Sequence, residues 1–476
     1  MSKPTFDVAG VRHGIVHLGL GGFHRAHMAR YTHDLMCLES DALSWGIAGA
    51  GMLPTDQGVC EALTSQDGLY TAIERDDGGE RACIIGAVRE AIFAGVSSEQ
   101  LLNRLRNPAI RIVSLTVTEN GYCLDPATKR LDAEHPQIAA DLRDPARARS
   151  PIGLIVEAAR QRRDDGAAPF TGLSCDNIQH NGEVLRRAVL QFARWREPAL
   201  AEWIDEHLLF PNTMVDRITP LPAIADQAWV SENYGILDRA PVVSEAFRQW
   251  VIEDKFCRGR PAWERVGAQF VSDVAPYEKM KLRLLNASHL AIAALGQLAG
   301  YTYVDEVMRN ASFQRFMQTL MDSETGMTIA DVPGVDLPEY KGTLIGRFAN
   351  TSIKDSVRRI CKDAPLNYLL DPLGDLIVED RNVPLLTLAL AAWIRRLQGH
   401  DDHGVPIPIE HPAADALMTR ARHSAKDPRP VLAIQSLFGD LGQNPTIVAA
   451  VANWLEMLDV KGSIGTMENA IGAATA

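Results

Sequence analysis

Short apolar runs alternate with helix-like segments in the first half of the chain. Residues 14–18 and 110–117 are short, apolar and partly β-branched, which is typical of buried parallel strands. The runs at 45–49 and 170–175 have the same character, and segments with helical spacing of apolar residues lie between the runs. This alternation predicts a doubly wound α/β sheet in the first part of the chain.

Local signals predict where single helices of this half begin. We expect one helix over about residues 25–38, and another that is capped by Ser97, with Gln100 completing a capping box. Pro54 should break any helix directly behind the second strand, because proline lacks an N–H group and clashes with the preceding turn.

Helical patterns dominate the second half, where strand signals are sparse. Helical runs occupy residues 277–300, 312–321, 385–397 and 446–458. We therefore predict a domain boundary near residue 275. Residues 1–275 would form the sheet domain, and residues 276–476 would form a mainly helical, substrate-binding domain.

Composition argues against several classes of protein. The 476 residues are 46% hydrophobic, and a formal net charge of −12 without a basic tract disfavours binding to nucleic acids or anionic membranes. No apolar run is long enough to cross a bilayer, and the first residues lack the features of a signal peptide. The seven cysteines form no Cys-x-x-Cys pair, which argues against a zinc site. We expect a cytoplasmic protein, either a monomer or a small homo-oligomer.

A glycine-rich turn follows the first predicted strand. It consists of Gly19, Leu20, Gly21, Gly22 and Phe23. Glycines between a strand and a helix let backbone N–H groups approach a pyrophosphate, as in Rossmann-type dinucleotide domains. The third glycine of that fingerprint would fall at position 24, which is a histidine. The segment therefore fits either a dinucleotide site or an ordinary tight turn.

Asp56 lies behind the second strand, where such domains distinguish NAD from NADP. An acidic side chain there accepts hydrogen bonds from the ribose and repels a 2′-phosphate, so NAD is favoured. A carboxylate that only caps a loop or helix fits the same position equally well. We interpret the nearby Gly49 and Gly51 as the loop of the second strand, not as a second fingerprint.

Four polar residues share one broad face of the helix predicted to follow residue 277. They are Glu278, Lys281, Asn286 and His289. A desolvated lysine can act as a base near neutral pH, an amide can donate to a developing alkoxide, and a histidine can orient a hydroxyl. The alternative is an amphipathic helix with a solvated polar face and a hydrogen-bonded histidine in the core.

Seven segments of the chain resemble the polyol-specific long-chain dehydrogenases, in the order in which that family has them. They are residues 14–27, 116–122, 174–177, 181–182, 211–220, 249–254 and 281–289. The resemblance implies a dinucleotide-binding domain followed by a helical substrate domain. It also implies NAD as cofactor, a polyol or ketose as substrate, and no catalytic metal.

The resemblance further implies roles for individual residues. Lys281 resembles the family's general base, which takes the proton of the alcohol. Asn177 and Asn286 resemble the two amides that hold the alkoxide oxygen, and Asn177 also falls among the residues near the cofactor. His289 resembles the residue that positions the substrate hydroxyls.

Two carboxylates and two pocket positions complete the assignments that the resemblance implies. Glu278 and Glu119 resemble carboxylates that help to relay the lysine proton to water, and Glu119 also belongs to the expected cofactor site. Asp216 and Arg359 match positions of the substrate pocket. The expected reaction is the oxidation of a secondary hydroxyl, with D-mannitol giving D-fructose.

The sequence departs from the family pattern at two places, which leaves the substrate open. Residues 362–367 replace the Asp-Gly-Ser-x-Lys segment that often follows the arginine matched by Arg359, and Ala246 replaces the proline of a common Glu-Pro-Phe. A fructuronate or tagaturonate reductase, or an arabinitol dehydrogenase, are alternatives within the family. A zinc-dependent polyol dehydrogenase and a non-catalytic NAD(H)-binding sensor are alternatives outside it.

Overall fold

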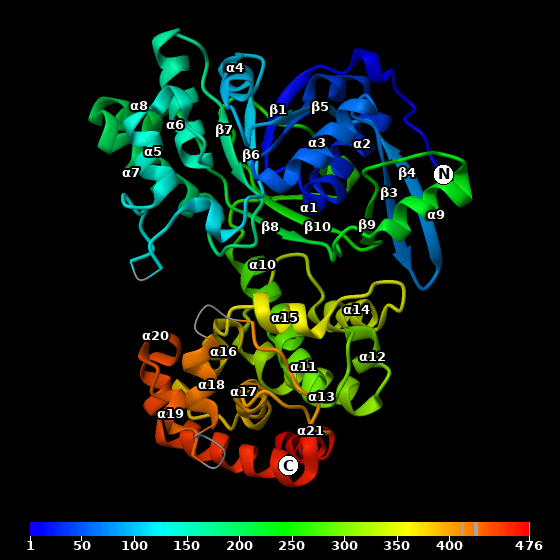
Figure 1. Cartoon of the computed structure of the whole chain (residues 1–476), viewed down its shortest axis with the longest axis vertical. Helices are drawn as coiled ribbons and strands as arrows, with labels where there is room; N and C mark the ends of the chain where they lie inside the picture. Colours follow the sequence, from blue (N-terminus) through cyan, green and yellow to red (C-terminus); the bar gives the residue numbers. More distant parts are fainter. Residues whose placement is uncertain (127, 411–413, 423–426, 476) are drawn as a thin grey trace. The chain divides into compact units, whose positions relative to one another are not determined.

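The chain forms two units, Met1–Ala275 (unit 1) and Pro276–Ala476 (unit 2). A computed structural model describes residues 1–126, 128–410, 414–422 and 427–475. Unit 1 contains a five-stranded parallel sheet, and unit 2 consists mainly of helices (Figure 1). The predicted fold class, a Rossmann-type sheet domain followed by a mainly helical domain, is confirmed.

The central sheet of unit 1 has the strand order β5-β2-β1-β6-β7, and its neighbouring strands all run parallel. The strands are β1 (His13–Leu18), β2 (Gly46–Gly51), β5 (Val88–Phe93), β6 (Ile112–Leu115) and β7 (Thr171–Ser174). From β1 the chain adds β2 and then β5 on one side. It then returns and adds β6 and β7 on the other side of β1. Ligands of doubly wound sheets bind outside the carboxyl ends of the strands at this reversal.

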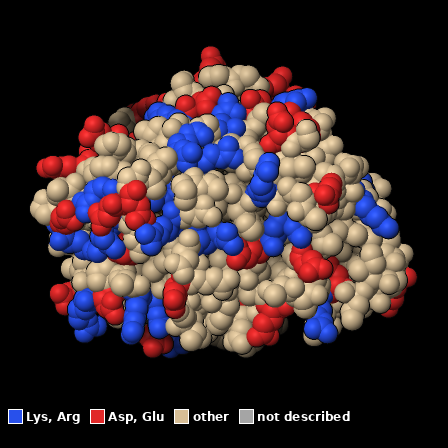
Figure 2. All heavy atoms as spheres, turned by 90° about the horizontal axis from the view of Figure 1, so that it is seen from above, with Lys and Arg blue, Asp and Glu red and all other residues tan. Residues whose placement is uncertain are grey.

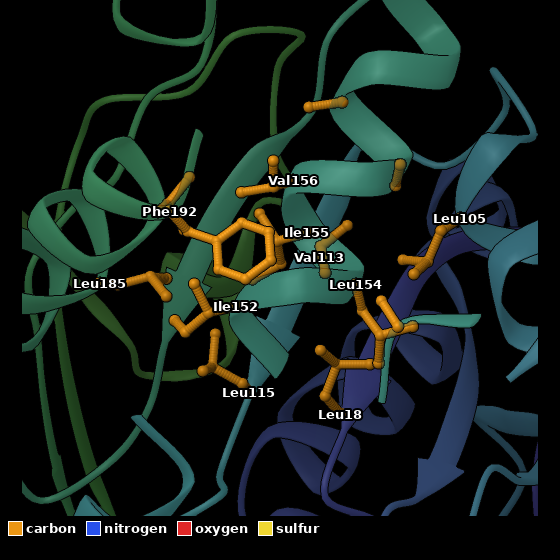
Figure 3. Close-up of a cluster of buried hydrophobic side chains, with 14 of the residues drawn as sticks. Leu18, Leu105, Val113, Leu115, Ile152, Leu154, Ile155, Val156, Leu185 and Phe192 are labelled. Atoms are coloured by element: carbon orange, nitrogen blue, oxygen red, sulfur yellow. The ribbon is translucent and has the colours of Figure 1, made fainter. Parts of the chain in front are cut away.

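Each face of this sheet has its own hydrophobic core, because side chains alternate along a strand. On β1, Val16 and Leu18 belong to one buried cluster and Ile15 to the other. Figure 3 shows the first cluster, in which side chains from β1 and β6 pack against helices. The helices are α4 (Glu99–Arg106), α6 (Pro151–Asp164), α7 (Asn181–Arg196) and α8 (Pro198–His207) on this face, and α2 (Met28–Leu38) and α3 (Gln57–Ser65) on the other.

Two small sheets of unit 1 were not predicted. They are β4-β3-β9, with β3 (Tyr70–Asp76), β4 (Gly79–Ile85) and β9 (Val242–Glu245), and β11-β10-β8, with β8 (Thr213–Asp216), β10 (Gln249–Glu253) and β11 (Gln269–Val271). The turn between β3 and β4 contains Asp77-Gly78, a common hairpin signal that would have revealed this pair. Helices α5 (Pro136–Arg143) and α9 (Ile224–Tyr234) complete the unit.

The helix predicted over residues 25–38 is confirmed for residues 28–38, but it is not continuous with the helical residues before it. The segment contains α1 (Gly22–Ala26) and α2, and His27 separates them with φ −112° and ψ −89°. The His27 ring lies 3.0 Å from the backbone oxygen of Gln249 through Nε2. A contact with a distant strand thus accompanies the break, and local spacing gives no sign of such a contact.

Three further local predictions were wrong. Pro54 starts a 3-10 turn that leads into α3, because proline suits the first position of a helical segment. Gly49 and Gly51 lie within β2 itself and not in its loop. The capping box is absent: Ser98 occupies the cap position of α4 without a side-chain cap bond.

Unit 2 is organised around α11, and no strand occurs in the part of it that the structure describes. Its helices are α10 (Ala275–Met280), α11 (Ala287–Leu298), α12 (Val304–Met308), α13 (Ala311–Ser323), α14 (Leu337–Ala349), α15 (Val357–Asp363), α16 (Asn367–Val378), α17 (Pro384–Arg396), α18 (Ala414–Arg422), α19 (Arg429–Leu432), α20 (Gln435–Phe438) and α21 (Pro445–Thr475). The four predicted helical runs lie in α10–α11, α13, α17 and α21.

The surface of the chain carries both signs of charge. In Figure 2, blue basic and red acidic side chains are interspersed over the face shown, so the net negative charge does not appear there as one block. Within the described ranges, no helix combines the length and the apolar character needed to cross a membrane.

Candidate functional site

The glycine turn of unit 1 packs tightly against the segment that follows β6. Gly19 has φ +96°, and a Cβ atom at this position would lie 2.1 Å from the backbone oxygen of Thr116, directly behind β6. Gly21 occupies the cap position of α1 without a side-chain cap bond. The first N–H groups of α1 are therefore left to another acceptor, and an anion is a suitable one.

A buried histidine supports this turn, and sequence reasoning gave it no role. His17 Nδ1 lies 2.8 Å from Ser114 Oγ, and its Nε2 lies 3.0 Å from the oxygen of Gly19. Burial lowers the pKa of His17 to about 3, so the ring is neutral near pH 7. His24 stacks on it with ring centroids 3.4 Å apart. The pair packs beneath the turn that would hold a pyrophosphate.

Asp176 fixes the segment behind β6 against the end of β7. Its carboxylate accepts hydrogen bonds from Thr118 N at 2.7 Å and from the Tyr122 hydroxyl at 2.9 Å. Burial raises the pKa of Asp176 to about 6. The next residue, Asn177, is exposed at the same edge of the sheet. Asp176 was also missed, because the residues that it binds lie on another loop.

The two other acidic candidates of unit 1 lie in loops. Asp56 Oδ2 accepts from Met52 N and Leu53 N, both at 2.9 Å, so this carboxylate caps the turn behind β2. Glu119 starts the 3-10 turn behind β6 and lies 3.5 Å from Lys129 Nζ, with both side chains exposed. The cofactor roles of Asp56 and Glu119 remain predictions.

Lys281 and Asn286 lie at the two ends of a π-helical turn, Lys281–Asn286, that joins α10 to α11. Glu278, Lys281 and Asn286 are 8%, 7% and 8% exposed. Successive turns of a π-helix bring residues five positions apart above one another, which is the separation of Lys281 and Asn286. These two side chains thus leave the helix closer together than the predicted α-helix would allow.

His289 lies in α11 beside Asp355, which sequence reasoning missed. His289 Nε2 is 3.5 Å from Asp355 Oδ2, and the ring stacks on Phe348 with centroids 4.6 Å apart. Arg359 donates to the other oxygen of Asp355, through Nε at 3.0 Å and an Nη at 2.5 Å. The predicted pocket arginine therefore anchors the carboxylate that faces His289.

The remaining pocket candidate, Asp216, is the last residue of β8 and is buried beside β10. Unit 1 thus groups the glycine turn, Asp176 and Asn177 at the carboxyl ends of β1, β6 and β7. Unit 2 groups Glu278, Lys281, Asn286 and His289 along one helix. Among the described residues, no set of three His, Cys, Asp or Glu side chains is placed to hold a metal ion.

The two halves of the sequence match two domains of one family. Residues 13–265 match the mannitol dehydrogenase Rossmann domain, and residues 273–459 match the mannitol dehydrogenase C-terminal domain. The chain belongs to the mannitol dehydrogenase family. The resemblance to polyol-specific long-chain dehydrogenases is thereby confirmed.

Relatives in this family match almost the whole chain. Mannitol 2-dehydrogenase of Aspergillus fumigatus is 44% identical over 447 residues, covering 92% of this chain and 89% of its own. The ternary complex of Pseudomonas fluorescens mannitol 2-dehydrogenase with NAD and D-mannitol has a TM-score of 0.90 at 40% identity, covering 98% of this chain and 96% of its own. A substrate-free D-sorbitol dehydrogenase has a TM-score of 0.89 at 33% identity, and the match covers 98% of this chain and 97% of its own.

Proposed function

We propose that this member of the mannitol dehydrogenase family oxidises a sugar alcohol at a secondary hydroxyl with NAD⁺, and that its main reaction converts D-mannitol to D-fructose. The observation that carries the proposal is the match to the Pseudomonas fluorescens enzyme over 98% of the chain, because that structure holds both NAD and D-mannitol. Because the chain is also similar to D-sorbitol dehydrogenase, other polyols are alternative substrates.

The residues of unit 1 fit a dinucleotide. Bound NAD⁺ would supply the acceptor for the hydride. The N–H groups at the start of α1 would bind its pyrophosphate, since no side chain caps them. Asp56 would accept from the ribose: both backbone donors bind its Oδ2, and its Oδ1 has no hydrogen-bond partner in the described part of the chain.

Two glycine variants separate the fold of this turn from its binding role. Gly19→Ala should lower the free energy of unfolding by about 3 kcal/mol, because the new Cβ would clash with Thr116 and φ is positive. Gly21→Ala should fold normally, since its Cβ would meet nothing nearer than an atom at 4.0 Å. It should nevertheless weaken NADH binding about tenfold by filling space beside the pyrophosphate. Urea unfolding and NADH fluorescence titration measure the two effects, and unchanged NADH affinity in Gly21→Ala would contradict this placement.

Lys281 is our candidate for the general base. It is buried, and as a neutral amine it would take the hydroxyl proton of the substrate. Glu278, one turn earlier and also buried, would pass that proton onward to water. No metal is needed in this scheme, because the base and the hydrogen-bond donors are side chains.

Amides would stabilise the alkoxide that forms as the proton leaves. Asn286 Oδ1 is buried and has no hydrogen-bond partner among the described residues, although nearly all buried polar atoms have one. A polyol hydroxyl would donate to this oxygen, and the Nδ2 group of Asn286 would be the donor to the alkoxide. Asn177 would act with Asn286, and His289, held by Asp355, would orient a neighbouring hydroxyl.

A substrate panel tests the proposal directly. We expect the highest kcat/KM with D-mannitol and NAD⁺, lower values with arabinitol and sorbitol, and little activity with NADP⁺. EDTA should leave the rate unchanged, which would exclude a zinc-dependent enzyme. Preference for a hexuronate would instead identify a uronate reductase, and NADH binding without turnover of any of these substrates would identify a sensor.

A further inference from the structure

A basic groove lies on unit 1, between α7 and residues 124 and 128–131, with a volume of about 590 Å³. Its lining has no Asp or Glu among the described residues and includes five cations: Lys129, Arg130, Arg186, Arg187 and Arg194. The whole chain has 60 acidic and 48 basic residues. The groove therefore reverses the average charge of the protein, and a site of this kind attracts anions.

Two of the five cations have carboxylate partners. Arg186 forms an ion pair with Asp205, and Lys129 lies 3.5 Å from Glu119. Within the described ranges, three guanidinium groups of the groove form neither an ion pair nor a hydrogen bond: those of Arg130, Arg187 and Arg194. Guanidinium groups bind phosphate oxygens in a bidentate manner, so an anion with several oxygens would satisfy them.

The walls of the groove are held together by the protein itself. Gln191 donates to the oxygen of Leu131 at 3.1 Å and accepts from its N–H at 3.2 Å, which ties the loop to α7. Arg187 and Arg194 lie seven residues apart on the same face of α7, hence about 10 Å apart along its axis. This spacing allows both arginines to contact one extended ligand.

The lining of the groove also includes apolar residues, namely Leu124, Leu131, Val184, Ala188 and Leu190. A lining that combines apolar and cationic residues suits a ligand with a ring system and a charged part, and the volume lies in the range of small-molecule sites. We propose that this groove binds a small organic polyphosphate of nucleotide size, whose phosphates contact Arg187 and Arg194.

Calorimetric titration of the whole protein with ATP tests this site. One equivalent of NADH is added first, so that the proposed dinucleotide site is filled while the groove remains available to ATP. We expect wild-type protein to bind ATP, more weakly as ionic strength rises. The double variant Arg187→Ala/Arg194→Ala should bind at least about tenfold more weakly. Both side chains are exposed, so the double variant should keep its fold, and a thermal melt checks this.

A matched control keeps the change in net charge the same. Arg81 and Arg147 are exposed residues of unit 1 outside the groove, and the variant Arg81→Ala/Arg147→Ala should bind ATP as the wild type does. Equal affinity of the groove variant and the wild type would overturn the proposal. The absence of ATP binding to the wild-type protein would also overturn the proposal. If a polyglutamate peptide bound while ATP did not, the groove would instead be a surface for acidic proteins.

Discussion

Lys281→Ala should lower kcat for D-mannitol oxidation by roughly 10²–10⁴-fold, the usual contribution of a general base. The residue is buried at the start of the π-helical turn, and the buried Asn286 lies at the other end of that turn. NADH affinity should change little, since the proposed cofactor contacts belong to unit 1. Stopped-flow and steady-state rates, with NADH fluorescence titration, measure both quantities.

Chemical rescue and a neighbouring lysine make this experiment specific. Small primary amines should restore part of the activity of Lys281→Ala, because they supply the missing base. Lys279→Ala makes the same truncation at a half-exposed lysine whose Nζ lies 3.8 Å from Asp375 Oδ2, and it should keep nearly full activity. If Lys281→Ala turned over D-mannitol at the wild-type rate, the proposed catalyst would be refuted.

The parallel sheet was predictable because its strands are covered on both faces. Strands such as β1 and β6 are buried at nearly every position and mostly apolar, so they stand out from the sequence without any knowledge of their neighbours. The long helices of unit 2 were predictable for a related reason, since α13 keeps its apolar residues at helical spacing. A strand such as β4, whose first three residues are exposed, carries no comparable signal.

The candidate site was predictable only where its residues share one element. Lys281, Asn286 and His289 follow one another along a helix, but the spacing of apolar and polar residues fits the roughly 100° per residue of an α-helix and gives no sign of the π-helical turn between the first two. Asp176 and Asp355 were missed for another reason. Their effect is to hold residues of other segments, and such contacts depend on tertiary packing.

Acidification from pH 7.5 to pH 5 should lower the free energy of unfolding of unit 1 by several kcal/mol, because unit 1 buries histidines in their neutral form. Burial lowers the pKa of His17 and of His27 to about 3 and that of His33 to about 4. Burial also holds the pKa of His24 well below its usual value. A histidine with a lowered folded pKa contributes full stability above about pH 6.5 and loses it as the pH falls toward the folded pKa. At pH 5 each such histidine lowers the free energy of unfolding by about 2 kcal/mol relative to pH 7.5.

His24 offers the sharpest test, since neither of its ring nitrogens has a hydrogen-bond partner in the described structure. His24→Phe removes the titrating group without breaking a hydrogen bond. The slope of unfolding free energy against pH, measured by urea unfolding between pH 6 and pH 5, should then fall by about 1.2 kcal/mol per pH unit. This slope measures the protons taken up on unfolding. It is therefore informative even if the larger phenylalanine ring changes the absolute stability of the variant. Exposed His403→Gln should leave the slope unchanged, and an unaltered slope in His24→Phe would show that His24 does not stay neutral in the folded protein.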